Sequence, residues 1–167
     1  MTGKNAIFYY EFIRALGYPY FYTRYKLVIQ GQGHIPAQGP AILLAKHQSW
    51  TDVPILTLAI KHQIHYVAKK ERFEKPLIRN FFYLMGGIPI DRKNPLNSLD
   101  SFKYIHYLLS RREYLVIFPE GTYFLNRMGP GKYRLIQLIL KYQEENRGQL
   151  PFVPIGIKYE ERNWRQK

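Results

Sequence analysis

His47 and Asp52 are the first pair of residues whose types and spacing suggest chemistry. They lie in the stretch LLAKHQSWTDVP (residues 43–54), which directly follows the apolar run Ala41–Ala45. An imidazole acts as a general base when a carboxylate on its other nitrogen fixes the tautomer. We therefore interpret His47 as a base and Asp52 as its orienting carboxylate. The alternative is a polar loop whose aspartate only caps the next helix, which is the commoner meaning of so short a pattern.

The nucleophile that such a base would activate is not evident in the chain itself. The sequence contains no cysteine, which excludes disulfides, thiolate metal sites and a cysteine nucleophile. It also lacks the Gly-x-Ser-x-Gly elbow that presents a serine nucleophile. These absences favour a hydroxyl of the substrate as the attacking group.

Two more polar clusters follow apolar runs later in the chain. In GGIPIDR (residues 86–92), Arg92 has the forked geometry that holds an anion. In FPEGT (residues 118–122), Gly121 permits a tight turn that directs Glu120 toward a hydroxyl of a substrate. Taken singly, the first cluster also fits a surface ion pair and the second an ordinary turn.

The elements that must position these residues alternate along the chain. Strands are predicted at residues 26–30, 41–45, 64–69, 88–90, 113–118 and 151–159, and helices at about 51–60, 71–87, 98–110 and 133–142. This alternation predicts an α/β fold with a mostly parallel central sheet flanked by helices. Ligands of such sheets bind beyond the carboxyl ends of the strands, where all three polar clusters fall.

The N-terminal residues 1–24 are predicted to form an amphipathic helical segment interrupted by Pro19, ahead of a single domain at residues 25–167. Ile7, Phe8, Phe12 and Leu16 recur near helical spacing. The segment either packs on the core of the domain or lies flat on a membrane surface. No apolar run is long enough to span a bilayer. The formal net charge of +13 attracts anionic lipid, nucleic acid or an anionic substrate.

Together and in order, KHQSWTD, GGIPIDR, FPEGT and FVPIGI resemble the four sequence blocks of the glycerolipid acyltransferase superfamily, over residues 41–157. The resemblance implies transfer of a fatty acyl group from acyl-CoA or acyl-carrier protein to a hydroxyl of lysophosphatidic acid or a related lysolipid, in phospholipid biosynthesis. His47 is then the base and Asp52 its partner. The substrate-binding residues are Arg92, associated with the phosphate of the acceptor, and Glu120, Gly121 and Thr122. No metal or cofactor is expected, since the acyl thioester is a co-substrate.

The resemblance also implies a partner surface and a location. We expect a membrane-associated protein, peripheral or monotopic, on the cytoplasmic face of an anionic membrane, and we expect no nucleic acid partner. One departure concerns Tyr123, which stands where the family usually has an arginine linked to phosphate recognition. Arg127, Lys132 or Arg134 would have to replace that charge. The alternatives are an acyltransferase for glycerol-3-phosphate or another lysolipid, and a non-catalytic basic module that binds lipid or nucleic acid.

Overall fold

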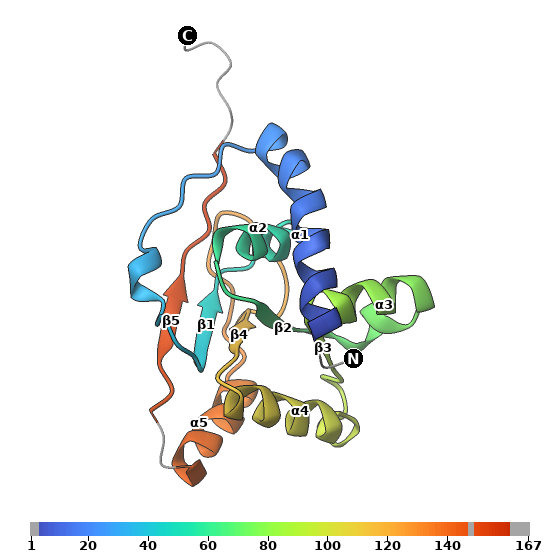
Figure 1. Cartoon of the computed structure of the whole chain (residues 1–167). Coiled ribbons are helices and arrows are strands. Elements are labelled where there is room, and N and C mark those ends of the chain that lie inside the picture. Colours follow the sequence, from blue (N-terminus) through green and yellow to red (C-terminus); the bar gives the residue numbers. More distant parts are fainter. Residues whose placement is uncertain (1–3, 147–148, 161–167) are drawn as a thin grey trace.

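A parallel β-sheet forms the centre of the protein. The computed structural model describes residues 4–146 and 149–160. Within these residues, five strands form one sheet in the order β3–β2–β4–β1–β5 (Figure 1). All four strand pairings are parallel, which confirms the predicted α/β class. The strands are β1 (Ala41–Ala45), β2 (Ile64–Lys69), β3 (Gly87–Ile90), β4 (Tyr114–Ile117) and β5 (Phe152–Ile155).

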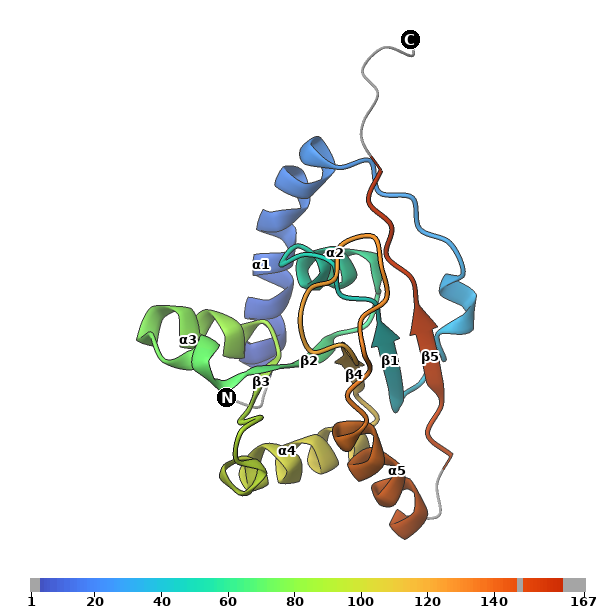
Figure 2. The same ribbon diagram turned by 180° about the vertical axis from the view of Figure 1, so that it is seen from behind.

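Helices cover both faces of this sheet (Figures 1 and 2). Tyr10 of α1 and Leu56 of α2 pack into the core on one face, and Ile105 of α4 and Ile139 of α5 pack into the core on the other. The helices are α1 (Lys4–Arg24), α2 (Asp52–Ala59), α3 (Pro76–Leu84), α4 (Leu99–Ser110) and α5 (Arg134–Asn146), with short 3-10 helices η1 (Gln32–His34), η2 (Lys70–Phe73) and η3 (Pro95–Ser98).

The side chains of β1 explain why an unbroken apolar run forms a central strand. Successive side chains of a strand point to opposite faces. Leu43 therefore packs into the core beneath α1 and α2, while Ile42 packs into the core beneath α4. Both side chains are fully buried, so each face of the strand must be apolar.

The predicted strand at residues 26–30 was wrong, and the last strand is shorter than predicted. Residues 25–30 are irregular and pair with no strand of the described sheet. Val28 is 71% exposed and Ile29 is 42% exposed, so these side chains lack the burial that stabilises a strand. At the other end of the chain, regular pairing of β5 stops at Ile155.

The predicted interruption at Pro19 was also wrong, because α1 continues through it to Arg24. The hydroxyl of Thr23 donates to the carbonyl oxygens of Pro19 and Tyr20, at 2.9 Å in each case. The rings of Tyr18 and Tyr22 stack across the proline with centroids 4.2 Å apart. These local contacts support the helix where proline removes one backbone hydrogen bond.

The predicted apolar face of α1 is largely exposed. Ile7, Phe8, Phe12 and Leu16 are all more than half exposed, whereas Tyr10 and Phe21 are buried. The helix therefore binds the domain through one side and presents an apolar side outward. In the described part of the chain, none of the helices has both the length and the hydropathy needed to cross a bilayer.

Candidate active site

His47 and Asp52 are joined by a short hydrogen bond. The Nδ1 atom of His47 lies 2.8 Å from Oδ2 of Asp52, and the carboxylate is fully buried. An ionised carboxylate only accepts hydrogen bonds, so Nδ1 must carry a proton, and in the neutral imidazole the lone pair is then on Nε2. Since His47 also lines a cavity, its imidazole has the arrangement of a general base.

The start of α2 explains how the carboxylate reaches the histidine. Asp52 is the first residue of α2, and its side chain folds back over the preceding loop. Its Oδ2 accepts hydrogen bonds from the backbone amides of Gln48 at 2.6 Å and Ser49 at 2.9 Å. A carboxylate in the first turn also interacts favourably with the helix dipole. The same Asp52 thus begins the helix and orients the imidazole of His47.

Asp52 remains ionised in spite of its burial. Burial alone would raise the pKa of the carboxyl group. Hydrogen bonds from His47, from the Ser49 and Gln48 amides and from the hydroxyl of Tyr159 outweigh that effect and hold the pKa below its usual value. Every oxygen of the buried carboxylate is therefore matched by a donor.

Two aromatic rings hold the imidazole of His47 in place. The ring of Phe118 stacks on it with centroids 4.0 Å apart. The ring of Tyr123 meets it edge to face at 4.4 Å. Tyr123 is the residue that stands in place of the expected arginine, and here it packs on the ring of His47 and lines the same cavity. Packing against two rings restricts the imidazole to one orientation.

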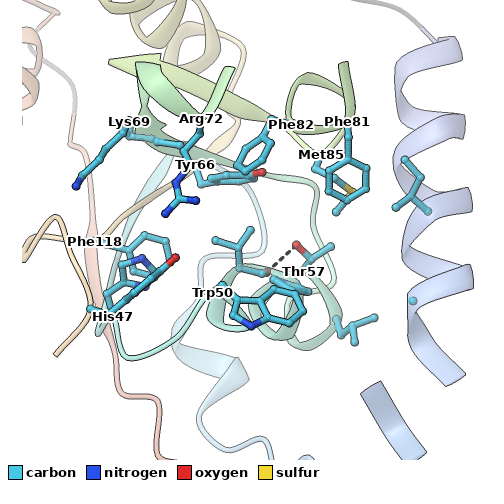
Figure 3. Close-up of a pocket in the computed structure, with 18 of the residues that line it drawn as sticks. His47, Trp50, Thr57, Tyr66, Lys69, Arg72, Phe81, Phe82, Met85 and Phe118 are labelled. Atoms are coloured by element: carbon cyan, nitrogen blue, oxygen red, sulfur yellow. Dashed lines mark hydrogen bonds between the residues drawn. The ribbon is translucent and has the colours of Figure 1, made fainter. Parts of the chain in front are cut away.

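A cavity of about 610 Å³ opens beside His47. Figure 3 shows His47 and Phe118 on one side and Tyr66, Phe82 and Met85 across the space. Most of its wall is apolar and comes from α1, α2, β2 and α3, while Arg92 and Thr122 add polar groups. The cavity thus combines a candidate base with room for an apolar chain.

The predicted binding residues lie at the same edge of the sheet, in two different roles. Arg92, Gly121 and Thr122 line the cavity, and Nη1 of Arg92 donates a hydrogen bond to the carbonyl oxygen of Gly121. Glu120 is buried and pairs with Nζ of Lys46 at 2.8 Å. In this arrangement the carboxylate of Glu120 holds the loop, and its contact with a substrate stays a prediction.

A second cavity of about 680 Å³ shares the side chain of Arg92 with the first. Lys132 and Arg134 add two more cations to its wall. A Cβ atom built on Gly121 would lie 2.8 Å from Nη1 of Arg92 and 3.2 Å from Cδ of Lys132. The two cationic side chains therefore flank Gly121 closely, at the junction of the two cavities.

Sequence reasoning missed Tyr159, Lys46 and Gln48. Tyr159 donates to Asp52 from 107 positions along the chain, and no local pattern marks it. Lys46 binds the carbonyl oxygen of Phe124 at 2.7 Å in addition to Glu120. Gln48 receives a hydrogen bond from the amide of Asn126 at 2.9 Å. The position of Lys46 and Gln48 beside His47 in the sequence was the only available signal of their role.

Among the described residues, no three His, Asp or Glu side chains gather as a metal site requires.

The family model described as Acyltransferase matches residues 26–158, and the chain belongs to this family. The resemblance seen in the sequence is thereby confirmed.

Several relatives carry the name 1-acyl-sn-glycerol-3-phosphate acyltransferase, among them the two described next. The protein from Bacillus subtilis (strain 168) is 37% identical over 95 residues, which cover 56% of this chain and 47% of the relative. The chloroplastic BAT2 protein from Brassica napus is 31% identical over 138 residues, which cover 81% of this chain and 38% of the relative. The chain thus spans less than half the length of either relative.

The fold is also similar to a crystal structure of PlsC, the 1-acyl-sn-glycerophosphate (LPA) acyltransferase from Thermotoga maritima. The TM-score is 0.64, and the match covers 93% of this chain and 70% of that protein. The sequence identity is 18%, so this likeness concerns the fold.

Proposed function

We propose that this protein transfers a fatty acyl group from a thioester, acyl-CoA or acyl-carrier protein, to the free hydroxyl of lysophosphatidic acid. The observation that carries the proposal is the His47–Asp52 hydrogen bond at the polar end of an apolar cavity. The names of the relatives from Bacillus subtilis and Brassica napus support the same acceptor.

The proposed reaction needs one proton carrier. Nε2 of His47 takes the proton of the acceptor hydroxyl as its oxygen attacks the thioester carbonyl carbon. The buried carboxylate of Asp52 stabilises the imidazolium that forms. The new C–O ester bond forms, the C–S bond breaks, and the imidazolium returns the proton to the leaving thiolate.

The phosphate of the acceptor would bind at the junction of the two cavities. One nitrogen of Arg92 is held by the carbonyl oxygen of Gly121, which leaves other guanidinium donors for an anion. Lys132 also lies close to Gly121 and adds a second charge. This pair supplies the cationic partner that the family arginine would have given at Tyr123.

The exposed apolar residues of α1 and α3 suggest how the enzyme meets its lipid substrate. Phe12 of α1 is 52% exposed, and Leu77 and Phe81 of α3 are 86% and 49% exposed. Both helices contribute to the wall of the first cavity. We infer peripheral association with an anionic membrane surface through this side, assisted by the net charge of +13. Binding to anionic vesicles should then weaken as salt is added.

An acceptor panel tests the proposed activity. The intact protein is incubated with labelled acyl-CoA, and in parallel with labelled acyl-carrier protein, together with lysophosphatidic acid, glycerol-3-phosphate or a lysolipid without a terminal phosphate. We expect acylated lysophosphatidic acid from the wild type and from the control His62→Ala, whose imidazole stacks on Tyr114. We expect none from His47→Ala.

Several results would overturn the proposal in whole or in part. If no acceptor is acylated, or if His47→Ala keeps the wild-type rate, the chain is not an acyltransferase of this mechanism. Transfer to glycerol-3-phosphate alone would retain the chemistry and reject the proposed acceptor. Binding of anionic lipid without any transfer would instead favour the non-catalytic module.

A further inference from the structure

Tyr159 binds the oxygen of Asp52 that His47 does not use. Its phenol hydroxyl donates to Oδ1 of Asp52 at 2.6 Å, while His47 lies on Oδ2 at 2.8 Å. The same phenol oxygen is 2.7 Å from the hydroxyl of Thr51. Side chains from two distant parts of the chain therefore hold the two oxygens of one buried carboxylate.

The segment after β5 is fastened to the loop that carries the base. The amide of Lys46 donates to the carbonyl oxygen of Ile155 at 3.0 Å, which extends the β1–β5 pairing by one bond. The side chain of Gln48 donates to the carbonyl oxygen of Ile157. Two anchors thus precede Tyr159 and direct its half-buried side chain toward the start of α2. A tyrosine on a loose strand end would have no such fixed position.

The protonation states of Tyr159 and Asp52 fix which of the two groups donates the hydrogen bond between them. Burial, and next the hydrogen bond to the Asp52 carboxylate, raise the pKa of the Tyr159 phenol. The same contact is among those that lower the pKa of Asp52. The phenol therefore stays protonated and donates, and the carboxylate stays ionised and accepts.

We propose that Tyr159 is a positioning residue of the His47–Asp52 pair. Its hydroxyl fixes the orientation of the Asp52 carboxylate and reduces the negative charge that this carboxylate presents to the imidazole. This inference rests on the proposed function. Tyr159 is absent from the walls of both described cavities, so its effect must pass through Asp52 to His47. It should therefore change the rate of the chemical step and leave substrate binding intact.

Removing the hydroxyl of Tyr159 should shift the pH profile of the reaction in a defined direction. In Tyr159→Phe, Oδ1 of Asp52 loses its side-chain donor, so the carboxylate attracts the imidazolium more strongly and His47 is harder to deprotonate. The acid limb of the pH profile of kcat/KM should move upward by about 0.5 pH unit. The looser carboxylate should lower the plateau kcat by roughly fivefold, with both KM values unchanged.

Other titratable groups near the pair are the same in the wild type and the variant. Tyr25 faces the ring of Tyr159 at 6.2 Å, and Tyr123 faces the ring of His47. Lys46, which is paired with Glu120, donates to the carbonyl oxygen of His47 at 3.1 Å. A shift seen in Tyr159→Phe can therefore be assigned to the lost hydroxyl.

The test compares Tyr159→Phe with the matched control Tyr25→Phe, which removes a neighbouring phenol hydroxyl. Acyl transfer is measured across pH for both variants and the wild type. In parallel, the proton titration of the His47 ring is followed by NMR without substrate. We expect both midpoints to move upward in Tyr159→Phe and to stay in place in Tyr25→Phe.

The two readouts separate the failure of this inference from the failure of the proposed function. If the wild type transfers no acyl group, the proposed function fails, and the NMR titration still decides the role of Tyr159. If folded Tyr159→Phe has the wild-type pH midpoint and kcat, or if Tyr25→Phe shifts equally, Tyr159 has no positioning role.

Discussion

Replacing Asp52 by asparagine removes the negative charge of this side chain and keeps its size and shape. In the structure, Oδ2 of Asp52 accepts hydrogen bonds from His47 and from two backbone amides, and Oδ1 accepts one from Tyr159. An asparagine has only one accepting oxygen. If that oxygen takes the place of Oδ2, the amide nitrogen faces the hydroxyl of Tyr159, whose oxygen must then accept a hydrogen bond where it donated one before. The loop keeps its backbone contacts, and the imidazole loses its anionic partner.

The size of the effect follows from the charge that develops during the reaction. The closest atoms of His47 and Asp52 are 2.8 Å apart. Two unit charges centred about 4 Å apart attract by about 4 kcal/mol at an effective dielectric constant near 20. Asparagine removes this stabilisation from an imidazolium that forms only as the hydroxyl is deprotonated. Since 1.36 kcal/mol corresponds to a tenfold change in rate, kcat should fall about a thousandfold.

The assay is steady-state transfer of a labelled acyl group to lysophosphatidic acid by Asp52→Asn. Asp100→Asn is the matched control, since the side chain of Asp100 is fully exposed on α4. The control should keep the wild-type rate, and the KM of Asp52→Asn should change little. A folded Asp52→Asn protein that loses less than tenfold in kcat would refute the reasoning.

Three further predictions concern the anion site and acid stability. Arg92→Ala should raise the KM for lysophosphatidic acid by roughly 10- to 100-fold with a smaller change in kcat, as acceptor saturation curves would reveal; an unchanged KM would exclude a phosphate contact. Gly121→Ala should lower the free energy of unfolding by about 1–2 kcal/mol in urea titrations, because Gly121 has φ +67° and its new methyl group would press on Arg92; equal stability would show that the turn adapts. Because the folded-state pKa of Asp52 is below its ordinary value near 3.8, its ionisation stabilises the fold above that pH, and this contribution is lost as the pH falls through the lower folded value. Urea unfolding between pH 5 and pH 2 should therefore lose stability more steeply for the wild type than for Asp52→Asn, by at most about 1.4 kcal/mol per pH unit; parallel curves would contradict the assigned ionisation.

Much of the sheet could be predicted because its strands are buried on both faces. The runs at 41–45 and 114–118 are continuously apolar, and β1 and β4 form there. The residues that follow the parallel strands must then meet at one edge of the sheet, as His47 after β1, Arg92 after β3 and Gly121 after β4 do around the first cavity. The catalytic and binding roles of these residues remain predictions.

Each error or omission has its own physical cause. Apolar composition predicted a strand at 26–30, but a strand also needs a partner, and Val28 and Ile29 remain exposed there. Proline predicted a break in α1, but side-chain contacts on both sides of Pro19 support the helix. Tyr159 is one of 15 tyrosines, and only the fold brings it to Asp52. Long-range contacts of this kind leave no periodic signal in the sequence.

A double-mutant comparison tests the central claim most directly, namely that Asp52 acts on the acyl transfer through His47. Residual transfer to lysophosphatidic acid is measured for His47→Ala, for Asp52→Asn and for the double variant. If the carboxylate serves only the imidazole, the double variant should retain the rate of His47→Ala alone. Losses that multiply, with the double variant about a thousandfold slower than His47→Ala, would contradict the account.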